Sequence, residues 1–109
     1  MPAKLWEILV PTETRQGKKP IRTRFHRVWD SKVREITGGL TIHQPVRGQW
    51  ICPRGELFAE RMIPVRIMCT DEQIEQIAAM TAVYYDQLAV MFYCVSSDVR
   101  ILNREARSP

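Results

Sequence analysis

The chain has 109 residues and a net charge of +4, with 45% hydrophobic and 26% charged residues. These totals predict one ordinary soluble domain, and no apolar run approaches the roughly 20 residues that cross a bilayer. The start, MPAKLWEILVP, has one lysine and a short apolar run that ends in proline. It does not resemble a signal peptide, so a cytoplasmic location is expected.

The positive charge is concentrated in one segment. Residues 15–34 contain eight of the sixteen Lys and Arg residues and a single acid, Asp30, so the segment carries +7 and the rest of the chain −3. A segment of this kind indicates either a solvated basic surface or a face that attracts anions.

The cysteines do not predict a metal site. Cys52, Cys69 and Cys94 are an odd number without CxxC spacing, and adding His26 or His43 gives no familiar pattern of zinc ligands. We therefore expect no metal and no other cofactor.

The first half of the chain predicts a strand, a loop and a helix. In residues 4–11, KLWEILVP, alternation places Trp6, Ile8 and Val10 on one face and Leu5, Glu7 and Leu9 on the other. Residues 12–23 combine Gly, Pro and charge, which predicts a flexible basic loop. A helix over residues 24–36 is expected, capped by Thr23 and ended by Gly38-Gly39. Its apolar stripe consists of Phe25, Val28, Trp29, Val33 and Ile36.

Residues 40–69 predict extended structure. A strand is expected over 40–46, confined to an edge or a bulge by Pro45. RGQWIC continues it, PRGE is a turn, and 59–69 is the next strand, with Ile63, Val65, Ile67 and Cys69 facing one way.

The last part predicts a helix and a strand. Thr70-Asp71-Glu72-Gln73 is a capping box, and residues 89–95 form an apolar run typical of a strand that is buried on both faces or lies at the centre of the sheet. Residues 98–102 extend that strand or add a short one, and 103–109 are a frayed tail. The expected buried stripe of the helix is Ile74, Ile77, Ala78, Thr81, Tyr85 and Leu88.

The element order β-α-β-β-α-β predicts a single ferredoxin-like domain over residues 1–109, an antiparallel sheet with two helices on one face. The other face would carry Met62, Met68, Met91 and Tyr93, which is too apolar for open water, so we expect a homo-oligomer, a dimer or trimer, that covers it. The alternative is that these residues face the helices, with each strand shifted by one residue.

The stretch GGLTIHQPVRGQW, followed by Glu60, resembles an uncharacterised bacterial family with a GLT…GQW…E signature on a ferredoxin-like fold. The likeness extends over residues 4–102 in element order, but that family implies no activity. The residues that carry the signature are Gly39, Leu40, Thr41, Gly48, Gln49, Trp50 and Glu60.

A more remote likeness is to the phage S-adenosylmethionine lyases, whose fold is similar to that of the trimeric PII proteins. Leu9-Val10-Pro11, Gly48-Gln49-Trp50, Glu60 and the strand PVRIMC (64–69) carry it. In that family a tyrosine and a glutamate at the subunit interface belong to the active site. The resemblance puts Glu60 at the acid, within one residue, and Trp50 at the tyrosine. An indole stacks on adenine but offers no phenol oxygen.

Trp50 and Glu60 are therefore the leading candidates, Glu60 for catalysis and Trp50 for binding. Facing each other across a hairpin, they would suit a cationic or adenine-bearing ligand. The alternative is that Trp50 packs in a core or interface and Glu60 pairs with Arg47 or Arg61. The other predicted ligand-binding residues are His43, Gln49, Arg22 and Arg24.

Three functions follow from these residues. A small-metabolite or nucleotide-binding protein with its site at a subunit interface is favoured. An S-adenosylmethionine lyase with Glu60 as the key acid is the alternative. Nucleic-acid binding through the basic segment 15–34 is the third, but no strand matches the aromatic RNA-binding motif of ferredoxin-like domains.

Overall fold

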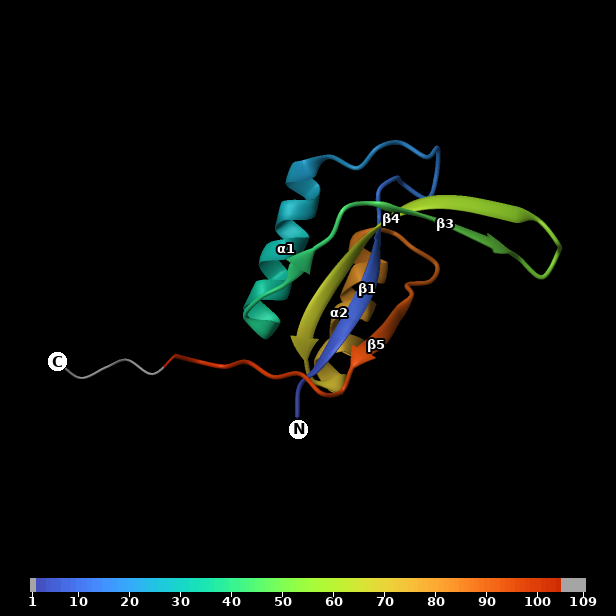
Figure 1. The fold of residues 1–109 in the computed structure, drawn as a ribbon. Helices are drawn as coiled ribbons and strands as arrows, with labels where there is room; N and C mark the ends of the chain where they lie inside the picture. The colour runs from blue at the N-terminus through green and yellow to red at the C-terminus, as the bar shows by residue number, and fades with distance from the viewer. Residues whose placement is uncertain (1, 105–109) are drawn as a thin grey trace.

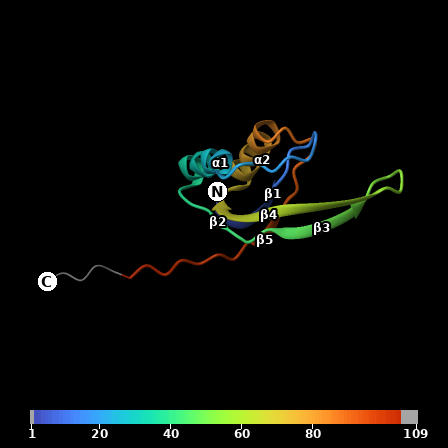
Figure 2. The same cartoon turned by 90° about the horizontal axis from the view of Figure 1, so that it is seen from above.

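The computed structural model describes residues 2–104 and contains a five-stranded antiparallel sheet with two helices on one face (Figure 1; Figure 2). The strand order is β2-β4-β1-β5. β3 pairs with the first part of β4, residues 57–62, and β2 pairs with residues 65–66 of the same strand. This arrangement confirms the predicted ferredoxin-like fold. The elements are β1 Lys4–Pro11, α1 Thr23–Thr37, β2 Thr41–Ile42, β3 Val46–Ile51, β4 Leu57–Cys69, α2 Asp71–Tyr84 and β5 Phe92–Ser96.

The two faces of the sheet follow the predicted alternation. Ile8 and Val10 of β1 and Val65 and Ile67 of β4 are buried beneath the helices. Ile8 pairs with Val65, so the neighbouring pair Glu7 and Arg66 lies on the opposite face, which we call the open face. The alternative shift by one residue is therefore wrong.

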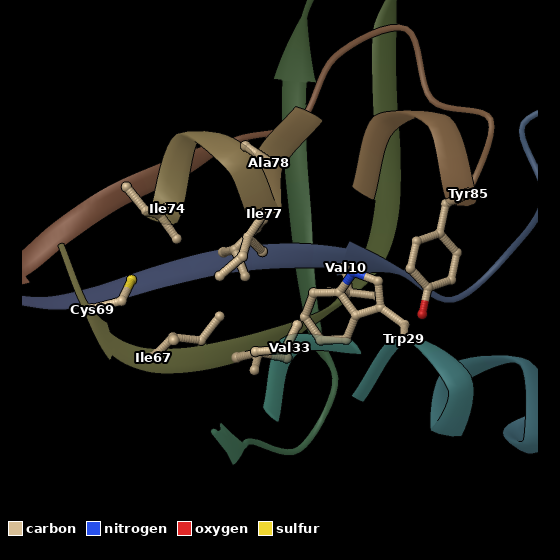
Figure 3. Packing of buried hydrophobic residues seen from close by; sticks show 11 residues of the cluster. Val10, Trp29, Val33, Ile67, Cys69, Ile74, Ile77, Ala78 and Tyr85 are labelled. Carbon is tan, nitrogen blue, oxygen red and sulfur yellow. The ribbon is translucent and has the colours of Figure 1, made fainter. Parts of the chain in front are cut away.

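The core lies between the sheet and the two helices (Figure 3). Trp29 and Val33 of α1 meet Ile74 and Ile77 of α2 over the central strands, and all four side chains are buried. The Trp29 indole N–H donates a hydrogen bond of 2.9 Å to the hydroxyl of Thr81, which is also fully buried. The one polar ring atom of Trp29 is thereby satisfied inside an apolar core.

The helix ends differ in one detail from the prediction. Arg22 occupies the N-cap of α1 without a side-chain cap, and Thr23 is already helical, so the predicted Thr23 cap is wrong. Gly38 ends the helix at φ +92°, a conformation that glycine adopts without strain, as expected. The predicted capping box of α2 is confirmed, with Thr70 and Gln73 each accepting a bond from the other's backbone N–H.

The strand predicted over 40–46 is interrupted. β2 ends at Ile42 and β3 begins at Val46, with Pro45 in the gap. Facing the gap, Pro64 accepts a 2.9 Å hydrogen bond from the His43 backbone N–H. In a hydrogen-bonded antiparallel pair each residue both accepts and donates a backbone hydrogen bond, but proline has no N–H to donate. The pairing of β4 with this part of the chain is therefore interrupted near Pro45 and Pro64.

The C-terminal part corrects three predictions. β5 pairs with β1 alone and forms an edge of the sheet, and Met91, Tyr93 and Val95 are 64%, 42% and 38% exposed, so the prediction of a strand buried on both faces is wrong. Residues 98–102 form no strand. Leu88 lies beyond the end of α2 and is 86% exposed, so it is not part of the buried stripe. The predicted frayed tail lies mostly outside the described residues.

The basic loop between β1 and α1 is tied to the domain by hydrogen bonds. Ile21 N–H donates to the Thr12 carbonyl, and Thr14 N–H donates to the Lys19 carbonyl. Arg15 forms an ion pair of 3.3 Å with Asp86 beyond the end of α2. The flexibility expected for residues 12–23 stays a prediction. No helix in the described part of the chain is long and apolar enough to cross a membrane.

Candidate functional site

The two strands around the sequence GQW form a ribbon that projects from the domain (Figure 2). We call residues 46–51 and 57–62 the β3–β4 ribbon. Within it Trp50 pairs with Phe58, and their rings stack with centroids 4.6 Å apart and planes 16° from parallel. The Trp50 side chain stays 48% exposed, so one side of this aromatic pair is free to meet another molecule.

Trp50 and Glu60 lie on the same face of the ribbon. Glu60 pairs with Gly48, the second residue before Trp50, so side-chain alternation directs both residues to one side. Glycine has no side chain beside the Glu60 carboxylate, and the space where its Cβ would lie is open. The ribbon thus presents an aromatic surface and an acid diagonally across one face, and Gln49 points to the other face.

Glu60 has no cationic partner within the described chain. The ion pairs found among residues 2–104 include neither Glu60 nor Arg47 nor Arg61. Arg47 and Arg61 pair with each other across the ribbon, on the face opposite Glu60. The alternative, an ion pair of Glu60 with Arg47 or Arg61, is therefore not seen in these residues, and the carboxylate remains available to a ligand or another subunit.

A polar cluster occupies the centre of the open face. Glu7, only 8% exposed, accepts a hydrogen bond of 3.0 Å from the Arg66 guanidinium and another from the Tyr93 hydroxyl. His43 lies on the same side, because its backbone bonds to Pro64, two residues before Arg66. The His43 Nε2 atom is buried without a hydrogen-bond partner in the described structure.

The cluster holds Glu7 ionised. Burial alone would raise the pKa of Glu7, but hydrogen bonds from Tyr93 and Arg66, with the positive charge of Arg66 and His43, outweigh burial and lower the pKa. The same hydrogen bond, together with burial, raises the pKa of the Tyr93 phenol. The open face thus carries a partly buried ion pair, Glu7 with Arg66.

Apolar side chains surround this cluster. Leu5 pairs with Met68 and Leu9 with Pro64, on either side of Glu7 and Arg66. Met68 is 37% exposed. An apolar surface with internally paired charges is suited to being covered, because burying it leaves no unpaired ion.

The predicted site residues fall into three places. Trp50 and Glu60 lie on the ribbon, and His43 lies on the same side of the sheet at the open-face cluster. Pro64, to which the His43 backbone bonds, is four residues beyond Glu60 along β4, which is about 13 Å at the usual rise per residue. Arg22 and Arg24 line a cavity in the helix layer that contains none of the other predicted residues.

Sequence reasoning missed Glu7, Arg66 and Tyr93 as a group. The only local signal is one acid in the apolar strand KLWEILVP, and its partners are 59 and 86 residues away along the chain. The cysteines are free, and the described residues contain no group of three or more side chains that could hold a metal ion. The ring nitrogen Nδ1 of His26 instead lies 2.7 Å from the Tyr85 hydroxyl.

Comparison with known proteins finds similar folds among solved structures. No protein family model matches the chain, and no curated protein matches it in sequence. The predicted bacterial family and its signature are therefore unconfirmed.

Solved structures match over most of the chain. The divalent cation tolerance protein CutA1 of Thermus thermophilus matches with a TM-score of 0.65 and 10% identity, over 93% of this chain and 87% of its own. A phage SAM lyase in complex with S-methyl-5'-thioadenosine matches with a TM-score of 0.63 and 17% identity, over 88% and 82%. The shared property is the fold.

A third solved structure has the same fold. The CutA of Archaeoglobus fulgidus, described as a periplasmic divalent cation tolerance protein, matches with a TM-score of 0.61 and 8% identity, over 96% of this chain and 88% of its own. The cytoplasmic location expected from the sequence stays a prediction.

Proposed function

We propose that the protein is a homo-oligomer that covers its open sheet face with further copies and binds a small adenine-bearing metabolite beside the ribbon, at a boundary between subunits. The observation that carries this proposal is the placement of Trp50, Phe58 and Glu60 together on one exposed face of the ribbon. One chain supplies a flat aromatic surface and an acid there, and a second subunit would supply the opposite wall.

The residues favour a ligand that is both flat and positively charged. A purine ring stacks on an indole, and a carboxylate attracts a sulfonium or ammonium group. S-adenosylmethionine carries both features, and a phage SAM lyase is among the proteins with this fold. S-adenosylmethionine is therefore the first ligand to test.

The test separates the aromatic contribution from the charge contribution. Titration calorimetry with S-adenosylmethionine and with S-methyl-5'-thioadenosine, the uncharged thioether, measures both affinities. Trp50→Leu should weaken both ligands about tenfold or more, since base stacking on an aromatic side chain is worth about 1–3 kcal/mol. Glu60→Gln should weaken S-adenosylmethionine alone.

Matched controls lie on the same ribbon and turn. Ile51→Ala changes an apolar residue on the opposite face, and Glu56→Gln removes an acid from the exposed turn. Neither should alter binding. Failure of both ligands to bind the native protein would overturn the proposal, and so would equal losses in the controls.

A second candidate is an S-adenosylmethionine lyase. The fold shared with a phage SAM lyase and the free Glu60 carboxylate favour it. Incubation with S-adenosylmethionine, followed by chromatography for S-methyl-5'-thioadenosine, tests this activity, and Glu60→Gln should abolish it. Binding without product formation in the native protein would leave a binding protein and exclude the lyase.

A further inference from the structure

A cavity of about 500 Å³ lies in the helix layer, between the basic loop, the start of α1 and the end of α2. Its size is within the range of small-molecule sites. The lining is mainly apolar and includes Pro20, Ile21, Phe25, Val28 and Tyr84. Thr14, Arg22 and Arg24 complete the lining, which contains no acid.

One wall of the cavity is a fixed aromatic surface. Phe25 and Tyr84 stack with ring centroids 4.2 Å apart, and the Tyr84 hydroxyl donates a 2.7 Å hydrogen bond to the Phe25 carbonyl. Phe25 and Val28 belong to the apolar stripe of α1, yet they stay 39% and 49% exposed. The stripe therefore extends beyond the core and presents unburied apolar surface to the cavity.

The opposite wall is the loop, which has hydrogen bonds and an ion pair of its own. The Thr14–Lys19 and Thr12–Ile21 hydrogen bonds close the loop on itself. The Arg15–Asp86 ion pair joins it to the chain just after α2. The cavity is thus bounded by defined contacts on both sides.

The charge at the cavity is positive and uncompensated. Neither Arg22 nor Arg24 takes part in an ion pair among residues 2–104. Arg22 is the N-cap of α1, and the first turn of that helix has no acidic residue. Guanidinium groups bind phosphate through paired, charge-assisted hydrogen bonds. The cavity therefore combines an anion-binding edge with an aromatic surface.

We propose that this cavity binds a nucleoside monophosphate, with the base against Phe25 and Tyr84 and the phosphate on Arg22 and Arg24. The site is separate from the one on the ribbon. The residues that line it belong to the basic loop and the two helices. These helices lie on the side of the sheet away from the open face (Figure 2), so the cavity stays accessible when further copies cover that face.

Three probes test whether the base and the phosphate are both required. Titration calorimetry on the full chain compares adenosine 5'-monophosphate, adenosine and inorganic phosphate. The monophosphate should bind at least tenfold more tightly than either fragment, and its affinity should fall as the salt concentration rises. Adenosine binding as tightly as its monophosphate would overturn the proposal, as would no binding of the monophosphate.

Variants locate the site. Arg22→Gln with Arg24→Gln should reduce monophosphate affinity at least tenfold. The control pair Arg27→Gln and Lys32→Gln removes the same charge from the same helix, outside the cavity lining, and should cost less than threefold. Equal losses in the two pairs would show general electrostatic attraction and contradict the proposal.

Two further variants complete the test. Val28→Trp fills the cavity from an exposed position and should abolish binding while the circular dichroism spectrum stays native. The titrations are repeated in a Trp50→Leu background, which removes adenine binding at the ribbon, and Arg22→Gln with Arg24→Gln should still reduce monophosphate affinity at least tenfold there. If Trp50→Leu abolishes monophosphate binding and Arg22→Gln with Arg24→Gln does not, the nucleotide binds at the ribbon and the cavity proposal fails.

Discussion

Met68→Asp is expected to dissociate the proposed oligomer. Met68 lies on the open face, 37% exposed and paired with Leu5. If another copy covers this face, the new carboxylate must lose its water, and the neighbouring Arg66 is already engaged by Glu7. Dehydration of an ion costs several kcal/mol. A total cost of about 4 kcal/mol would raise the dissociation constant about a thousandfold.

Light scattering coupled to size-exclusion chromatography measures the outcome at several protein concentrations. Val83→Asp is the matched control, because Val83 is an apolar residue of α2, 84% exposed, in the helix layer. The native protein and Val83→Asp should give the same mass, and Met68→Asp should give the mass of one chain with a native circular dichroism spectrum. A monomeric native protein, or an intact Met68→Asp oligomer, would refute the reasoning.

Three further changes test individual contacts by urea unfolding at fixed protein concentration. Thr81→Val keeps the shape of the side chain but leaves the buried Trp29 N–H without an acceptor, so it should lower the free energy of unfolding by about 1–2 kcal/mol. In a Trp29→Phe background the same substitution should lower it by less than about 0.5 kcal/mol. Equal losses in the two backgrounds would disprove the coupling between Thr81 and Trp29. Gly38→Ala should lower the free energy of unfolding by about 1 kcal/mol, because the φ of +92° is unfavourable for alanine. The added Cβ would meet no atom within 4 Å, so no steric clash contributes. An unchanged urea midpoint would contradict this expectation. Tyr93→Phe removes a hydrogen bond that lowers the pKa of Glu7. The stability supplied by a lowered carboxyl pKa is present above the unfolded value of about 4.3 and is lost as the pH falls through the folded pKa. The variant should therefore be less stable at pH 7, the difference should shrink in acid, and a constant difference would refute the assignment.

Much of the fold could be predicted because local sequence and long-range packing agree. The alternation around Ile8 predicts which face of β1 is buried, and Thr70 with Gln73 marks the start of α2 through its own hydrogen bonds. These signals lie within a few residues of the structure they determine. They remain visible without knowledge of the partners.

The site was less predictable because its geometry depends on pairing between distant residues. That Trp50 and Glu60 share a face follows from the β3–β4 register, which the turn and the strand lengths set together. The contact between Glu7 and Tyr93 joins the first and last strands. The edge position of β5 was misjudged because an apolar run also occurs where surface is left for another molecule to cover.

Pro64 lies where the pairing on one side of β4 is interrupted between β2 and β3. Residues 43–45 form no strand beside it, so beyond this point the ribbon is joined to the domain through the last β1–β4 pairs, which end at Pro11 with Met62, and through the Thr12 hydrogen bond to the Arg61 carbonyl. Within residues 2–104, the two strands of the ribbon beyond Met62 pair only with each other. Both outer edges of the ribbon therefore present backbone N–H and C=O groups to which a further strand can bond.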